Sequence, residues 1–328
     1  MLPHLCLTFA MWLLSSALLS GAIPTLSTST LQARAVTNTS KAGLAWPNGN
    51  SLNINQYDAT GKVSWYYTWS AFPVASRRLE FSPMLWGQST INQFTSTIRR
   101  TLSNTRLNVT AVLGMNEPEL QEQSNLSPEE GAQIWQTHLE PLRALGVRLG
   151  SPAPSSSPRG KIWLQDFFAA CKGNCTVDFI ALHWYGTNAS WFISHLEDYQ
   201  ETFQRPLWVT EWACHNFVDL DEQCSDEEIV EFMNVTQSFM DNADFVERYA
   251  WFGAMRDMNN VNPSNALMNG NGQISPLGIQ YIDAIGWTNL TSNAGRPSIT
   301  VISGRSLSFQ CFWTTFFTLV ALHIYLSL

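Results

Sequence analysis

The chain has 328 residues and a net charge of −8 at pH 7; only 13% of its residues are charged, but 14 are tryptophan. The acidic balance argues against nucleic acid or an anionic lipid surface as the partner. Tryptophan at this density exceeds what a core of this size needs, so it indicates flat apolar surfaces that receive a flat ligand.

The N-terminal segment has the composition of an export signal. Residues 5–19 are apolar and uncharged, and the small residues Ser20 and Ala22 follow at the spacing that signal peptidase favours. We therefore expect a signal peptide over residues 1–22. A retained membrane helix is the alternative, although the apolar run is shorter than the ~20 residues of a span. Residues 23–40 are rich in Ser and Thr and predict a linker.

Residues 41–287 predict one domain in which strands and helices alternate. This pattern favours an α/β fold, a (β/α)8 TIM-type barrel, with some outer helices missing because the first connections are short. An open doubly wound sheet is the rival, but the sequence has no Gly-rich phosphate loop to support it. The eight expected strands are short apolar runs, at residues 42–48, 63–70, 80–87, 109–118, 148–154, 178–186, 206–214 and 248–255.

Two helices have clear N-terminal signals. Ser127 and Glu130 form one capping box, and Ser225 and Glu228 form another. Apolar residues then recur at helical spacing after Ser127, until Pro141 interrupts the pattern. Proline lacks the amide hydrogen that an inner helical turn needs, so we expect a kink or a break there.

The cysteines and glycosylation sequons agree with export. Two short disulfide loops, Cys171–Cys175 and Cys214–Cys224, are the simplest pairing of the four cysteines outside the apolar ends. A zinc site is the alternative, and an oxidising compartment disfavours it. N-x-S/T sequons predict glycosylation at Asn38, Asn108, Asn125, Asn174, Asn188, Asn234 and Asn289.

The C-terminal end has the order of a lipid-attachment signal. Three small residues begin at Asn293, a polar spacer follows within residues 288–310, and residues 311–328 are apolar and uncharged. This order predicts a GPI anchor at Asn293, removal of the tail, and a location at the cell surface or in the cell wall. Ser303 is a second possible attachment site, and an ordinary membrane helix at the tail is the alternative.

Two acidic residues end apolar strands in the predicted barrel. Glu117 ends the fourth strand and Glu211 ends the seventh, so both should lie at the carboxyl-end face, where barrel active sites form. Facing carboxylates suit glycoside hydrolysis, with Glu117 as acid and base and Glu211 as nucleophile. The alternatives are a turn-capping role for Glu117 and an ion pair between Glu211 and Arg248.

Other residues near the strand ends are candidates for substrate binding. We expect Asn116 to bind a sugar 2-hydroxyl and Tyr185 to donate a hydrogen bond to Glu211, which should stay ionised. We expect His183 to be a satisfied core histidine or a substrate contact, and a third catalytic group is the alternative. Aromatic faces stack on sugar rings, although each tryptophan could equally be core. The candidates are Trp46, Trp69, Trp86, Trp184, Trp212 and Trp251. We expect no metal, because the sequence has no HExxH motif and no close histidine pair with a carboxylate.

Four motifs carry a family resemblance. "PMLWG", "GMNEPE", "ALHWYG" and "WVTEWA" occur in that order, and over residues 42–287 the chain resembles the glycosyl hydrolase catalytic core of glycoside hydrolase family 128, a group common in fungi. The resemblance implies a retaining endo-β-1,3-glucanase with Glu117 as acid/base and Glu211 as nucleophile. We expect β-glucan as the partner, no cofactor and a monomer. A non-catalytic glucan-binding wall protein and a glucan transglycosylase are the alternatives.

Overall fold

The computed structural model of the chain describes residues 40–283. The expected signal peptide, the linker up to residue 39, the attachment region and the apolar tail lie outside the described residues. So do the sequons at Asn38 and Asn289 and the anchor candidate Asn293. Across residues 40–283, none of the helices is both long and apolar enough to cross a membrane.

All eight predicted strands are present, and several are shorter than their apolar runs. A strand needs backbone partners on its neighbours, and the ends of the apolar runs turn away into loops. The strands are β1 (Ala42–Ala45), β2 (Val63–Tyr67), β3 (Glu80–Phe81), β4 (Ala111–Val112), β5 (Arg148–Leu149), β6 (Ile180–Gly186), β7 (Leu207–Cys214) and β8 (Val246–Trp251).

The strands follow one another around a ring. Six pair in parallel in the order β3-β2-β1-β8-β7-β6, and β4 pairs with β5. Single parallel bridges, Met84 with Leu113 and Gly150 with Phe179, join the pair to the larger sheet on both sides. This is the strand order of a TIM-type barrel, with the ladder reduced to isolated bridges at two places. The α/β prediction is confirmed, and the barrel prediction is consistent with this ring.

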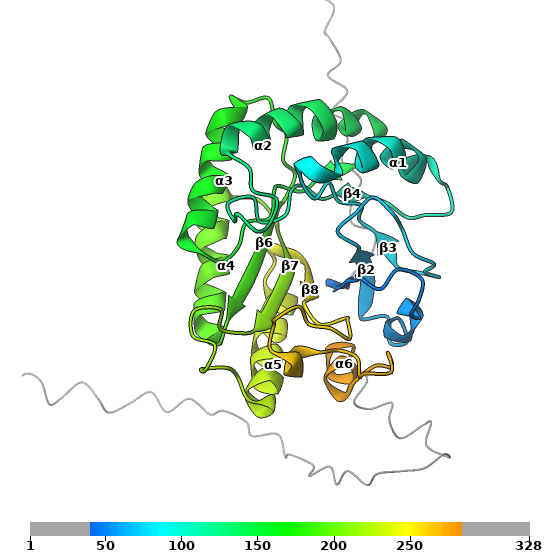
Figure 1. The fold of residues 1–328 in the computed structure, drawn as a ribbon, viewed down its shortest axis with the longest axis vertical. Helices are drawn as coiled ribbons and strands as arrows, with labels where there is room; N and C mark the ends of the chain where they lie inside the picture. The colour runs from blue at the N-terminus through cyan, green and yellow to red at the C-terminus, as the bar shows by residue number, and fades with distance from the viewer. Residues whose placement is uncertain (1–39, 284–328) are drawn as a thin grey trace, which may run out of the picture. The chain divides into compact units, whose positions relative to one another are not determined.

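Helices cover the outside of most of the ring (Figure 1). They are α1 (Ile91–Ser103), α2 (Pro128–Ile134), α3 (Pro158–Cys171), α4 (Ala189–Phe203), α5 (Asp226–Asn242) and α6 (Pro276–Tyr281). Between β1 and β2 there is only a 3-10 turn, Ile54–Tyr57, and within the described span from β2 to β3 no helix forms. The predicted shortage of outer helices on this side is therefore confirmed.

The predicted helix signals act as expected. Ser127 and Ser225 each accept a hydrogen bond from the backbone three residues on and form full capping boxes at α2 and α5. After α2 the chain continues as a π-helical turn, Trp135–Leu139, and then as a 3-10 helix, Glu140–Leu145, which contains Pro141. The helix loses its regular α geometry around Pro141, since proline offers no amide hydrogen to the preceding turn.

A buried ion pair lies inside the barrel. Arg248 on β8 is fully buried and contacts Glu80 on β3 at 2.6 Å. Its guanidinium packs over the rings of Trp65 at 5.4 Å and Trp208 at 4.4 Å. The partner of Arg248 is therefore Glu80, which removes the alternative that Arg248 pairs with Glu211.

Both predicted disulfides are present, so the zinc alternative is wrong. Cys171 pairs with Cys175 at the end of α3, and Cys214 at the end of β7 pairs with Cys224 ahead of α5. The sequon asparagines within the described residues are all exposed, and their glycosylation stays a prediction. They are Asn108, Asn125, Asn174, Asn188 and Asn234.

Candidate active site

Glu117 lies beyond the carboxyl end of β4, which ends at Val112, and a tight turn holds it there. Its amide donates to the carbonyl of Ala153 at 2.8 Å, and its own carbonyl accepts from the amide of Leu120 at 3.1 Å. The turn puts Glu117 at a φ of 38°, a left-handed conformation that residues with a Cβ atom rarely adopt. Such strain concentrates at functional sites, where the surrounding structure enforces it.

Glu211 faces Glu117 from β7. Both side chains are buried, with 7% of Glu117 and 5% of Glu211 exposed. One oxygen of each carboxyl group and a ring nitrogen of His183 lie within 4.8 Å of one another. Carboxyl groups about 5 Å apart are typical of retaining glycosidases, whereas inverting enzymes need a wider gap for a water molecule.

Two aromatic side chains donate hydrogen bonds to Glu211. The Tyr185 hydroxyl donates to Oε2 at 2.6 Å, and the Trp69 indole donates to Oε1 at 2.9 Å. The hydroxyl of Tyr67 donates to the carbonyl of Thr210 at 3.0 Å, and its oxygen lies 3.4 Å from Oε1 of Glu211. Tyr185 was expected as a donor from sequence, whereas Trp69 was expected only as a stacking surface. These bonds fix the carboxylate and favour its ionised form.

Burial nevertheless raises the pKa of Glu211, and the charge of Glu117 acts in the same direction. The charge of His183 and the hydrogen bonds from Tyr185 and Trp69 oppose the rise in pKa. The expectation of a simply ionised Glu211 overlooked this desolvation. The pKa of Glu211 is therefore raised, and the hydrogen bonds from Tyr185 and Trp69 are needed to stabilise its ionised form.

His183 lies against both carboxylates and is buried away from the open space above them. Its Nδ1 is 2.9 Å from Oε1 of Glu117 and 3.6 Å from Oε2 of Glu211, and its side chain is fully buried. Burial alone would lower its pKa, but the charge of Glu211 and the hydrogen bond with Glu117 raise it. His183 is therefore a positioning residue, and its assignment as a substrate contact is wrong.

The same three groups are the one set within residues 40–283 with the spacing of metal ligands. The nearer nitrogen of His183 is already engaged by Glu117, and Glu211 already accepts from Tyr185 and Trp69. The donor set is thus arranged for holding protons between acids and bases.

A cavity of about 1040 Å³ opens over the two carboxylates. Asn116 lines it, and its Nδ2 donates to Gln123 at 3.2 Å, while its Oδ1 is buried without a partner among the described residues. Asn116 therefore lies at the cavity wall beside Glu117, and its contact to a sugar hydroxyl stays a prediction. The cavity is large enough for several sugar units and carries the polar groups and apolar faces typical of a ligand site.

The six candidate tryptophans divide into two groups. Trp69, Trp86 and Trp184 line the cavity. The other three, Trp46, Trp212 and Trp251, are completely buried in the core, so the prediction that they stack on substrate is wrong. Trp212 shows the reason, because it follows Glu211 in β7 and neighbouring strand residues point to opposite faces.

Several residues of the cavity were not expected. Phe252 follows β8 and packs on Trp69 and Tyr185, and Phe217 follows β7 and packs on Tyr185. Ser155, Ser156 and Ser157 line the wall before α3. The sequence signal for Phe217 was its position three residues after Cys214, inside the loop that the disulfide closes.

Comparisons with known proteins agree on one family. Residues 43–281 match the family described as glycosyl hydrolase catalytic core. Alkali-sensitive linkage protein 1 of Schizosaccharomyces pombe is 33% identical over 250 residues, which are 74% of this chain and 44% of that protein. The chain thus spans less than half the length of that curated relative.

Solved structures give the same picture. A subgroup II endo-β-1,3-glucanase of glycoside hydrolase family 128 from Sorangium cellulosum is 31% identical, with a TM-score of 0.62, over 74% of this chain and 98% of that one. A subgroup III curdlan-specific exo-β-1,3-glucanase of that family from Blastomyces gilchristii, in complex with glucose, is 29% identical, with a TM-score of 0.61 and the same coverage.

Proposed function

The chain belongs to the glycosyl hydrolase catalytic core family, within glycoside hydrolase family 128, and we propose that it is a retaining endo-β-1,3-glucanase. The observation that carries this proposal is the pair of buried carboxyl groups, Glu117 and Glu211, with oxygens within 4.8 Å at the floor of a large cavity. The family members of solved structure from Sorangium cellulosum and Blastomyces gilchristii are β-1,3-glucanases, which supports the same linkage.

The first chemical step breaks the glycosidic bond. Glu117 gives its proton to the leaving oxygen, while an oxygen of Glu211 bonds to the anomeric carbon and forms a glycosyl ester. Tyr185 and Trp69 donate hydrogen bonds to Glu211 and so hold its carboxylate in place for the attack. The contact between His183 and Glu117 orients the acid, and Asn116, which lines the cavity beside it, binds a sugar hydroxyl.

The second step hydrolyses the ester. Glu117, now ionised, takes a proton from water as the water oxygen attacks the anomeric carbon, and Glu211 leaves as a carboxylate. Two displacements restore the original anomeric configuration, so the product keeps the β form. The spacing of the two carboxyl groups supports this route over inversion.

The test is hydrolysis of defined glucans by the soluble domain. We expect release of β-1,3-oligosaccharides from laminarin, with little product from cellulose, and a β-anomeric first product by NMR. Glu211→Gln should lower kcat by more than about 10³-fold because a neutral amide cannot form the ester. Glu211→Ala should regain activity with azide as an external nucleophile.

The outcomes separate the candidate functions. Wild-type protein that binds insoluble β-1,3-glucan but releases no sugar would support a binding protein and overturn the hydrolase proposal. Products longer than the starting oligosaccharide would show that a sugar acceptor replaces water, which is transglycosylation. Single glucose units released from one chain end would indicate exo action instead of endo action.

We also propose that the protein is fungal and acts at the cell surface or in the cell wall, held by a GPI anchor. The export signal at residues 1–22, the small residues at Asn293 and the apolar tail at residues 311–328 support this location. Phosphatidylinositol-specific phospholipase C should release the protein from intact cells. Retention on the cells after that treatment would argue for a membrane-spanning helix at the tail.

A further inference from the structure

We infer that Phe217, presented by the disulfide loop of residues 215–223, is a sugar-stacking residue that extends glucan binding beyond the cleaved bond. This inference rests on the proposed function and assigns a further substrate-binding residue to the same site. Phe217 is 54% exposed and lines the cavity over Glu211. An exposed phenylalanine at the wall of a ligand cavity provides the flat apolar surface that a pyranose ring can cover.

Phe217 ends a continuous row of aromatic side chains that begins at Glu211. Trp69 and Tyr185 hydrogen-bond Glu211, and Phe252 packs between them, with ring centroids 6.1 Å from Trp69 and 5.8 Å from Tyr185. Phe217 packs edge-on against Tyr185 at 5.1 Å. The row Trp69–Phe252–Tyr185–Phe217, the aromatic wall, thus leads from the reacting atoms to the solvent.

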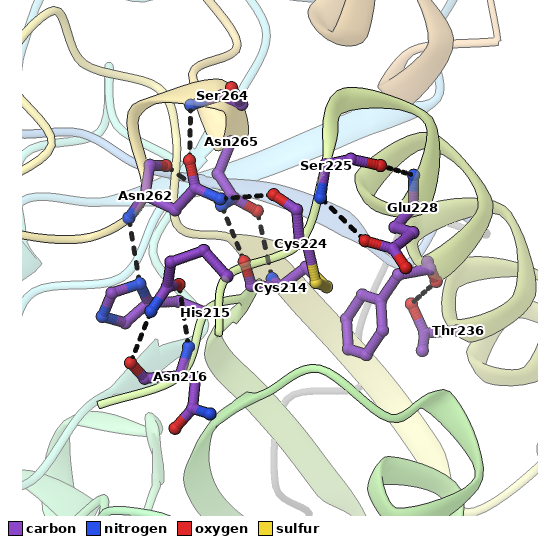
Figure 2. Close-up of a disulfide and its surroundings, with 12 residues drawn as sticks. Cys214, His215, Asn216, Cys224, Ser225, Glu228, Thr236, Asn262, Ser264 and Asn265 are labelled. Atoms are coloured by element: carbon purple, nitrogen blue, oxygen red, sulfur yellow. Dashed lines mark hydrogen bonds between the residues drawn. A yellow bond between two sulfur atoms is a disulfide. The ribbon is translucent and has the colours of Figure 1, made fainter. Parts of the chain in front are cut away.

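The disulfide loop is held in one conformation. Two hydrogen bonds join Asn216 and Gln223 across the loop. The backbone amide of Asn216 donates to Oε1 of Gln223 at 3.1 Å, and Nε2 of Gln223 donates to the backbone carbonyl of Asn216 at 2.7 Å. The base of the loop is fixed by Asn265, whose side chain bonds both backbone groups of Cys214, as Figure 2 shows. His215, the first residue of the loop, packs on Phe217 with ring centroids 4.1 Å apart.

A second loop supports the same surface from the other side. Nδ2 of Asn262 donates to the backbone carbonyl of Cys224, and the backbone amide of Asn262 donates to Nδ1 of His215 at 3.1 Å (Figure 2). Phe217 is therefore presented by a braced loop, so little conformational entropy is lost when a sugar covers it. Val218, 98% exposed and also lining the cavity, widens the apolar surface.

The test compares binding and turnover for Phe217→Ala. In the inactive Glu211→Gln background, Phe217→Ala should weaken laminarihexaose binding about tenfold, equivalent to about 1.4 kcal/mol. In the active enzyme, KM for laminarin should rise about tenfold with kcat and the pH profile nearly unchanged. Phe217→Trp should keep both Kd for laminarihexaose and KM for laminarin near the values of the protein with Phe217, because tryptophan keeps a flat aromatic face.

Leu220→Ala is the matched control. Leu220 is 67% exposed on the same loop and is not among the residues that line the cavity, so its variant should bind and cleave like wild type. If Phe217 only supported Tyr185, Phe217→Ala would shift the pH profile and lower kcat, which would overturn the inference. Unchanged Kd and KM would overturn it as well.

Failure of the proposed function has a different signature. In that case wild type releases no sugar from laminarin, whether or not Glu211→Gln binds laminarihexaose, and this is seen before Phe217 is altered. The inference on Phe217 fails alone when wild type cleaves laminarin and Phe217→Ala has the same KM. The two results are therefore separated by the wild-type measurement.

Discussion

Nδ1 of His183 lies 2.9 Å from Oε1 of Glu117, and the imidazole is fully buried between that carboxyl group and Glu211. The histidine thus contacts both the residue that acts first as acid and then as base, Glu117, and the residue that acts as nucleophile, Glu211, in the proposed retaining reaction. Because the charge of Glu211 and the hydrogen bond with Glu117 raise the pKa of His183, the imidazole is stabilised in its protonated form beside two acids. This arrangement links the protonation of the whole site.

Tyr185→Phe should move the acidic limb of the pH–activity profile to higher pH. The 2.6 Å hydrogen bond from Tyr185 lowers the pKa of Glu211, so its loss raises that pKa and the carboxylate forms only at higher pH. We expect kcat to fall about 10–10² fold, from loss of one charge-assisted hydrogen bond. The measurement is kcat/KM for laminarin across the pH range.

Tyr199→Phe is the control for that experiment. The Tyr199 hydroxyl is buried without a hydrogen-bond partner among the described residues, and Tyr199 does not line the cavity. Its removal should leave the profile in place. A Tyr185→Phe profile that coincides with wild type would contradict the role given to this bond.

Arg248→Met should lower the free energy of unfolding by about 3–5 kcal/mol, since it leaves Glu80 as a buried charge without its partner. Adding Glu80→Gln should recover most of that loss, because the amide oxygen still accepts from Thr110 and no charge remains. Urea unfolding of both single variants and the double variant measures the coupling. Losses that simply add would show that the pair does not act as a unit.

His195→Phe should reduce the loss of stability in acid. Burial lowers the pKa of His195 to about 4, whereas an exposed histidine titrates near 6.5. The unfolded chain therefore binds a proton below about pH 6.5 that the folded chain refuses until about pH 4, and stability falls across that window.

The expected size for His195 is about 1 kcal/mol between pH 7 and pH 5, after a discount for partial exposure. Phenylalanine keeps the ring contacts with Trp184 and Tyr199 and removes the titration. Unfolding free energies at the two pH values should differ less in the variant than in wild type. An equal difference in the two proteins would refute the assignment.

Removing the Cys214–Cys224 disulfide should affect both stability and binding. Replacing both cysteines with alanine frees a loop of sequence separation 10 and should lower the unfolding free energy by about 2–3 kcal/mol. KM for laminarin should rise, because Phe217 loses its fixed position. The Cys171–Cys175 pair is the control, since its loop of separation 4 does not line the cavity, and its removal should leave KM unchanged.

The sequence predicted the elements that depend on local chemistry. All eight strands formed where short apolar runs occur, both capping boxes begin helices, and the acid that follows β4 lies close to the acid within β7. Each of these depends on a few neighbouring residues or on one property of barrels, which is that all strand ends of one kind meet at one face.

The sequence did not show which way each strand-end side chain points. Trp212 was expected beside the substrate, although the inward position of Glu211 already requires its neighbour to point outward in an alternating strand. Phe252 and Phe217 follow strands and enter the cavity through loop geometry, which periodicity does not encode. The pairing of Arg248 with Glu80 joins residues 168 positions apart, so no local pattern could reveal it.

The left-handed backbone at Glu117 has a consequence for how such a domain can evolve. At a φ of 38°, glycine or asparagine has a lower conformational energy than glutamate, so the acid at this position opposes the local backbone preference. Replacing Glu117 with glycine would therefore abolish turnover and also raise the free energy of unfolding. A single substitution at this position would thus convert the proposed glucanase into a more stable domain that binds glucan without cutting it.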